Sequence, residues 1–181
     1  MVKIILVQSS LNPESRTAIV IQHCAELLTT LGIDNKIIDL RNYNIPFCDG
    51  RKLKNYGLDV QALHRELSEA DAYIIGYPVY LYTFSGVLKN FFDIFGGATK
   101  HKYYGIVATA GGQSSYLSSK ELVSILSFDL DMTVVQPTVY SHEDHYENEI
   151  LTSPYVHTKI QKMVQQLVWI TQSTVELLSS A

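Results

Sequence analysis

The chain has 181 residues, a formal net charge of −4 and a hydrophobic fraction of 46%. This hydrophobic content is enough to bury a sizeable core and excludes an intrinsically disordered chain. The acidic balance argues against a nucleic-acid partner, because neutralising phosphates requires a basic face.

Short apolar runs alternate with helical patterns from the start of the chain. Residues 3–7 form an apolar, β-branched run that predicts a strand buried on both faces. The run is too short for a signal peptide or a membrane span. Residues 16–31 repeat apolar side chains at the spacing of one helix face, and Gly32 follows as a C-cap. Residues 36–40 predict a second strand, after which Pro46 and Gly50 mark a long loop.

The same alternation continues to the end of the chain. A short helix is predicted over residues 59–69 with Asp59 as its cap, and a further helix begins near Ser85 and ends near residue 97. Pro137 is expected to end the last strand. The remaining predicted elements are strands at 72–76, 103–109 and 133–136, and helices at 114–128 and 156–178.

Five strands separated by helices predict one α/β domain spanning residues 1–181. Right-handed crossovers favour a five-stranded parallel sheet in the order 2-1-3-4-5, with helices on both faces. In such a sheet a ligand binds at the carboxyl ends of the strands, where the strand order switches. The loops after the first, third and fourth strands are therefore the predicted binding region.

The first of these loops, residues 9–17, is rich in hydroxyl groups and contains Arg16. It leaves a buried strand and enters a helix, whose N-terminal N–H groups and dipole favour an anion. The alternative interpretation is that Ser15 only caps the helix. The loop has neither G-x-G-x-x-G nor the glycines and lysine of a P-loop, which argues against dinucleotides and nucleoside triphosphates at this turn.

The segment 70–93 is more specific. It reads as a strand, then Pro78-Val79-Tyr80, a short turn, and S-G-V-L-K-N-F-F-D opening a helix. This resembles the signature of the NADPH-dependent FMN reductase family. The Ser-rich first loop and the Thr109-Ala110-Gly111-Gly112 turn are similar to the family's other two flavin contacts. The resemblance implies a flavodoxin-like three-layer α/β/α fold.

The resemblance also implies an oxidoreductase that passes a hydride from NADPH or NADH through FMN to a flavin, quinone or similar small acceptor. No catalytic side chain is expected, since the cofactor supplies the chemistry. The FMN phosphate would be held by Ser9, Ser15, Arg16 and Thr17. The isoalloxazine edge would meet Pro78, Val79, Tyr80 and Leu81, and the opposite side would meet Thr109, Gly111, Gly112 and Gln113.

Two positions depart from the family pattern. Gln8 stands where relatives usually have a small residue, and Leu11 where many have an arginine. Gln8 would either crowd the phosphate or contribute a hydrogen bond to it. Neither these positions nor any others define a clamp for a 2′-phosphate, so the preference between NADH and NADPH stays open.

Several further expectations concern partners and surroundings. No metal site is expected, because His142 and His145 lie in a predicted loop without a third ligand. Cys24 and Cys48 lack metal or redox spacing and indicate reduced thiols in a cytoplasmic protein. The family commonly forms homodimers or homotetramers. The helix over residues 87–95 suits such a contact through Leu88, Phe91, Phe92 and Phe95, with core burial as the alternative.

Two other functions remain open. A flavodoxin-type electron carrier would bind FMN without a nicotinamide site, although the T-x-T-G-x-T loop of such carriers is absent. A flavin-free binding module would fit if Gln8 blocked the phosphate. Tyr80, Tyr82 and Phe84 would stack either on a nicotinamide or acceptor, or on a neighbouring subunit.

Overall fold

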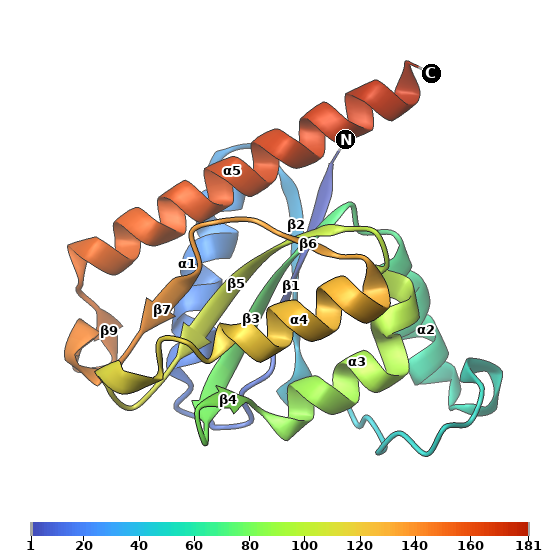
Figure 1. Cartoon of the computed structure of the whole chain (residues 1–181), viewed down its shortest axis with the longest axis horizontal. Helices are drawn as coiled ribbons and strands as arrows, with labels where there is room; N and C mark the ends of the chain where they lie inside the picture. Colours follow the sequence, from blue (N-terminus) through green and yellow to red (C-terminus); the bar gives the residue numbers. More distant parts are fainter. Residues whose placement is uncertain (1, 181) are drawn as a thin grey trace.

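In the computed structural model, which describes residues 2–180, a parallel sheet lies between two layers of helices (Figure 1). The order of strands is the predicted one, with the fifth position divided between two short strands that both pair with β5. The strands are, in spatial order, β2 (Asp34–Asp39), β1 (Lys3–Gln8), β3 (Ala72–Tyr80), β5 (Tyr103–Thr109), and then β6 (Thr133–Val134) and β7 (Val139–Ser141).

The last strand corrects the sequence-based prediction. The sequence predicts a strand over residues 133–136 that Pro137 ends, whereas β6 already ends at Val134; the peptide bond between Gln136 and Pro137 is cis. The chain nevertheless returns to the sheet edge as β7, which pairs with β5 from Val107 to Thr109. Because β7 extends the sheet towards its carboxyl edge, residues that follow it lie near the predicted binding loops.

Successive side chains of each strand belong alternately to two hydrophobic cores, one on each face of the sheet. Ile4 and Leu6 of β1 belong to the core under α1 (Arg16–Thr30) and α5 (Pro154–Ser179), whereas Ile5 and Val7 belong to the opposite core. This explains why β1 reads as a continuous apolar run. Helices α2 (Leu58–Ser68), α3 (Gly86–Thr99) and α4 (Ser119–Leu130) cover the second face. Among the described residues, no helix combines the length and apolar character needed to cross a membrane.

Only some of the helix starts lie where the sequence predicts them. Ser85 accepts a hydrogen bond from the Leu88 N–H and caps α3 as predicted. Gly57, rather than Asp59, occupies the cap of α2, and Asp59 lies in its first turn. Helix α4 begins five residues later than predicted, at Ser119 instead of 114, because a 3₁₀ turn over Gln113–Ser115 comes first.

The aromatic face of α3 lies in the core. Leu88, Phe91 and Phe95 are at most 1% exposed and Phe92 is 9% exposed. These side chains pack under the sheet with α2 and α4, so they are unavailable for a subunit contact. The core alternative is therefore the correct one for this helix.

A tight hairpin joins β3 to β4 (Thr83–Phe84) through Leu81 and Tyr82, at φ 49° and 63°. Left-handed backbone at both positions is typical of a type I′ turn, which favours Asn-Gly. Replacing the pair by Leu81→Asn with Tyr82→Gly is expected to raise the free energy of unfolding by about 1 kcal/mol, because the strain disappears. Urea denaturation measures this, and an unchanged or lower stability would contradict it.

Candidate functional site

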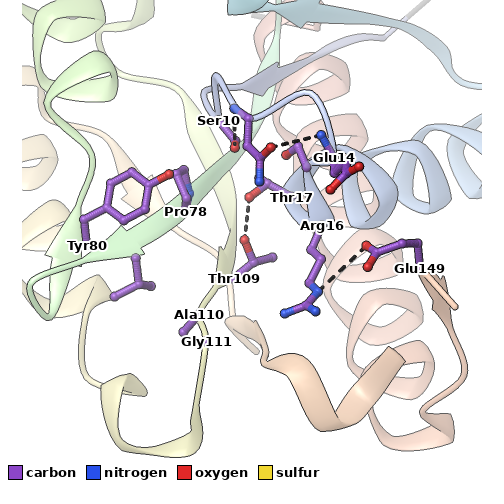
Figure 2. A pocket seen from close by; sticks show the side chains of 13 residues that line it. Ser10, Glu14, Arg16, Thr17, Pro78, Tyr80, Thr109, Ala110, Gly111 and Glu149 are labelled. Atoms are coloured by element: carbon purple, nitrogen blue, oxygen red, sulfur yellow. Dashed lines mark hydrogen bonds and ion pairs between the residues drawn. The ribbon is translucent and has the colours of Figure 1, made fainter. Parts of the chain in front are cut away.

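The loops after β1, β3 and β5 meet at the carboxyl edge of the sheet around a cavity of about 300 Å³. Figure 2 shows the side chains that line it converging from all three loops and from one later hairpin. The lining residues are Ser10, Asn12, Glu14, Ser15, Arg16 and Thr17 from the first loop, Pro78, Val79 and Tyr80 from β3, Thr109, Ala110 and Gly111 from β5, and Glu149.

The start of α1 supplies the part of this cavity whose chemistry suits an anion. The Ser15 hydroxyl accepts a hydrogen bond from the Ala18 N–H at 3.1 Å, which is the capping role considered for it. The N–H groups of Arg16 and Thr17, at the first two helical positions, precede the first intrahelical bond and point out of the helix. The Thr17 hydroxyl is hydrogen-bonded to that of Thr109, so α1 and β5 are tied together in the cavity wall. Capping and anion binding are thus compatible here.

The side chain of Gln8 fixes the first loop through hydrogen bonds to its backbone. Its side-chain amide donates to the Ser10 carbonyl and to Asp39 Oδ1, both at 3.0 Å, while its oxygen accepts from the Ser10 N–H. Asp39 also binds Arg41, whose guanidinium donates to the carbonyls of Asn12 and Pro13. Gln8 is 1% exposed and does not line the cavity. It therefore neither crowds the cavity nor reaches into it.

The hydrogen bonds that Asp39 accepts from Gln8 and Arg41 depend on pH, because they require the charged carboxylate. Burial alone would raise the pKa of Asp39, but hydrogen bonds and charge from Arg41, together with the Gln8 amide, lower it below its ordinary value of 3.8. A lowered pKa in the folded state means that the stabilisation is complete above pH 3.8 and is lost as the pH falls through the folded-state pKa.

Asp39→Asn is accordingly expected to lower the free energy of unfolding by about 1 kcal/mol at neutral pH, since a charged hydrogen bond is lost. The difference from wild type should shrink below pH 3.8. Urea denaturation of both proteins across this range measures the effect, and a difference that is independent of pH would contradict it.

The carboxyl end of β3 forms a second wall. Pro78 is buried, Val79 is half-buried and Tyr80 is 56% exposed at the cavity mouth. The helical part of the S-G-x-L-K-N-x-x-D motif has structural roles instead. Asn90 accepts from the Cys48 N–H and donates to the Pro46 carbonyl, which fastens the long loop after β2 to α3.

The turn after β5 forms the third wall. The Ala110 N–H donates to the Ser141 carbonyl at 2.9 Å, so β7 fixes where this turn begins. A Cβ atom built on Gly111 or Gly112 would meet no atom within 4 Å. The space beside these two glycines is therefore open, and their backbone is accessible to a ligand.

The hairpin of β8 (Tyr146–Glu147) and β9 (Ile150–Leu151) closes one side of the cavity. Its tip places Glu149 Oε2 4.0 Å from Arg16 Nε, and the Arg16 guanidinium lies 5.3 Å from the centre of the Tyr146 ring. Nothing in the local sequence indicated this hairpin, because it is brought to the site by β7 and α5.

Most of the predicted site residues meet at this cavity. Ser15, Arg16, Thr17, Pro78, Val79, Tyr80, Thr109 and Gly111 line it. Sequence reasoning did not single out Ser10, Asn12, Glu14, Ala110 or Glu149 as site residues. The first four lie in the loops after β1 and β5, which the sequence motifs had already indicated as binding loops. Glu149 lies outside these loops, and no sequence motif pointed to it.

Four of the predicted residues do not line the cavity. The Ser9 hydroxyl is fully buried and donates to the Gly76 carbonyl at 2.9 Å, which ties β1 to β3. Leu81 is 96% exposed at the hairpin tip. Gly112 lies just beyond the lining residues. Gln113 faces a separate cavity of about 350 Å³, with His142 and His145 among its walls.

The His142 to His145 segment forms a 3₁₀ turn over Glu143–His145. Its two imidazole rings lie 3.9 Å apart, centre to centre, and the His142 N–H donates to Nδ1 of His145. Within residues 2–180, no group of three His, Cys, Asp or Glu side chains is arranged to hold a metal ion.

Comparison with known proteins identifies the family of this chain. The model of the family described as NADPH-dependent FMN reductase matches residues 2–146. The chain belongs to this family. An NAD(P)H-dependent FAD/FMN reductase of Geobacillus thermodenitrificans is 33% identical over 138 residues, covering 76% of this chain and 73% of the relative. An FMN reductase (NADPH) of Pseudomonas aeruginosa is 25% identical over 182 residues, covering 99% and 97%.

The fold agrees with that assignment. A flavoenzyme NAD(P)H:(acceptor) oxidoreductase of Paracoccus denitrificans superposes with a TM-score of 0.77 at 16% identity, covering 96% of this chain and 98% of that one. The predicted flavodoxin-like architecture is confirmed. The cavity fits the cofactor of an FMN reductase in its chemistry: hydroxyls, a guanidinium and free helix N–H groups suit a phosphate, and the open glycine turn leaves room for a flat ring.

Proposed function

We propose that this chain binds FMN in the cavity between α1, β3 and β5 and reduces a small acceptor with NADPH or NADH. The observation that carries the proposal is the meeting of an anion site at the start of α1 with the open turn at Gly111, in a member of the FMN reductase family. When bound, FMN would supply the redox chemistry that links the nicotinamide to the acceptor.

The protein's contribution is to bind and orient. The hydroxyls of Ser10, Ser15 and Thr17, the N–H groups at the start of α1 and the Arg16 guanidinium would hold the phosphate through hydrogen bonds. Pro78, Val79 and Tyr80 would hold the edge of the ring, and the backbone of Ala110 and Gly111 would contact it from the other wall of the cavity. Backbone N–H groups fixed by the sheet are preorganised to stabilise negative charge on the reduced ring.

Anaerobic titration tests the proposal. Purified protein reconstituted with FMN is expected to lose its flavin absorbance when NADPH or NADH is added and to regain it with a quinone or free flavin. Flavin that binds but resists both nicotinamides would indicate an electron carrier of the flavodoxin type. Protein that fails to bind FMN would indicate a flavin-free module and overturn the proposal.

We also propose that the chain acts as one FMN-binding domain, in the cytoplasm, as a homodimer or homotetramer. The free thiols of Cys24 and Cys48 suit a reducing compartment. Since the aromatic face of α3 is buried, the subunit contact is expected over exposed apolar side chains near the cavity. These are Leu81, Tyr82, Tyr116 and Leu117. Light scattering at micromolar concentration tests this, and a monomer would contradict it.

A further inference from the structure

The β8–β9 hairpin brings a carboxylate to the anion-binding part of the cavity. Glu149 lines the cavity, and its carboxylate is turned towards the guanidinium of Arg16 at an Nε to Oε2 separation of 4.0 Å (Figure 2). Arg16 is the only cationic side chain among the lining residues, and Glu14 is a second acidic one. The formal charge of the cavity wall is therefore −1, although its hydroxyls and helix N–H groups suit an anion.

The hairpin holds Glu149 in the cavity wall in a backbone conformation that glutamate rarely adopts. Asn148 and Glu149 form a two-residue turn with φ 47° and 61°, a backbone that asparagine and glycine adopt more easily than glutamate. The turn is well anchored, because the Tyr146 hydroxyl bonds Ser141 Oγ at 2.8 Å and Leu151 is buried. Glu149 is therefore fixed beside Arg16 in the cavity wall, in a left-handed backbone conformation.

From this arrangement we propose that Glu149 competes with the FMN phosphate for Arg16, so that FMN is held weakly enough to exchange. The inference rests on the proposed function. A phosphate bound by Arg16 has to share the guanidinium with Glu149, and the dianion then faces the carboxylate nearby. Both effects oppose binding of the phosphate, while the ring contacts at β3 and β5 are unaffected.

The effect of Glu149 on FMN affinity is limited by the exposure of Glu149 and Arg16 to solvent. Glu149 and Arg16 have side chains that are 58% and 34% exposed, so solvent screens their interaction. Removing the carboxylate is accordingly expected to tighten FMN binding by about three- to tenfold. Glu149 also lies outside the segment that the family model matches, which ends at residue 146.

Flavin fluorescence titration of the apoprotein tests the proposal with Glu149→Gln and with Glu149→Gly. The second variant removes the charge and also relieves the left-handed turn, so its folding is secure. Glu147→Gln is the matched control, because Glu147 lies on the same hairpin but not in the cavity wall. Riboflavin, which lacks the phosphate, is titrated alongside FMN.

Both Glu149 variants are expected to bind FMN more tightly and to release it more slowly, with riboflavin affinity and the Glu147→Gln protein unchanged. The gain should shrink between about 50 mM and 500 mM salt. FMN affinity that is unchanged or weaker in the variants, or a gain shared equally by riboflavin, would overturn the proposal. Wild-type protein that binds neither flavin would instead overturn the proposed function, and this inference with it.

Discussion

Arg16→Ala is expected to weaken FMN binding by about 10- to 100-fold, because a charged hydrogen bond to a phosphate contributes about 1.5–3 kcal/mol. Without the guanidinium, the cavity wall keeps the two carboxylates of Glu14 and Glu149 with no compensating cation. The affinity for riboflavin should stay within about twofold of wild type, since no phosphate is present to lose its partner. Fluorescence titration with both flavins measures the effect.

The Arg16 variant should remain folded. Its ion pair with Glu149 is partly exposed, and pairs of this kind contribute at most about 1 kcal/mol. Arg65→Ala is a suitable control, because Arg65 is exposed on α2, outside the cavity wall. If Arg16→Ala binds FMN as wild type does, the phosphate is held elsewhere and the assignment of the α1 loop is wrong.

Gly76→Ala is expected to lower the free energy of unfolding by about 2 kcal/mol. A Cβ at this position of β3 would lie 2.6 Å from Ile21 Cγ1 and 3.1 Å from Thr17 Cγ2, so α1 must shift away from the sheet. Since Thr17 lines the cavity, the shift should also weaken FMN binding. Urea denaturation and flavin titration measure the two effects.

Two further variants isolate the cause of that destabilisation. Gly97→Ala, on the exposed side of α3, has only His64 Nε2 near its new Cβ, at 3.9 Å, and should be neutral or slightly stabilising. Ile21→Ala makes room for the Cβ that the Gly76→Ala substitution introduces, so the double variant should lose less stability than the sum of the single ones. Additive losses would show that contact with Ile21 is not the cause.

Much of the fold could be predicted from local patterns. The runs Ile4 to Val7 and Ile74 to Ile75 are apolar on both faces because helices cover both sides of the sheet, and this composition is visible in the sequence. Ser15 and Ser85 marked their helix starts because capping depends on neighbours in the chain. The return of the chain at β7 after Pro137 depends on pairing with distant β5, which no local pattern records.

Part of the candidate site could likewise be predicted from local motifs, and part could not. Thr17, Pro78 and Gly111 came from motifs at strand ends, and the sheet brings such ends together by its topology. Ser9 was expected at the phosphate, but its hydroxyl donates to the Gly76 carbonyl, because Ser9 directly follows Gln8, which pairs with Gly76 of β3. Glu149 could not be found, because its approach to Arg16 depends on where β7 and α5 place a hairpin.

A crystal structure of the protein grown with excess FMN would show whether the cofactor lies at the start of α1. We expect its phosphate within hydrogen-bonding distance of Thr17 and Arg16, and its ring between Pro78 and Gly111. We also expect the guanidinium of Arg16 to face the phosphate. FMN bound at another edge of the sheet, or a cavity at the start of α1 that remains free of it, would show that the site is assigned wrongly.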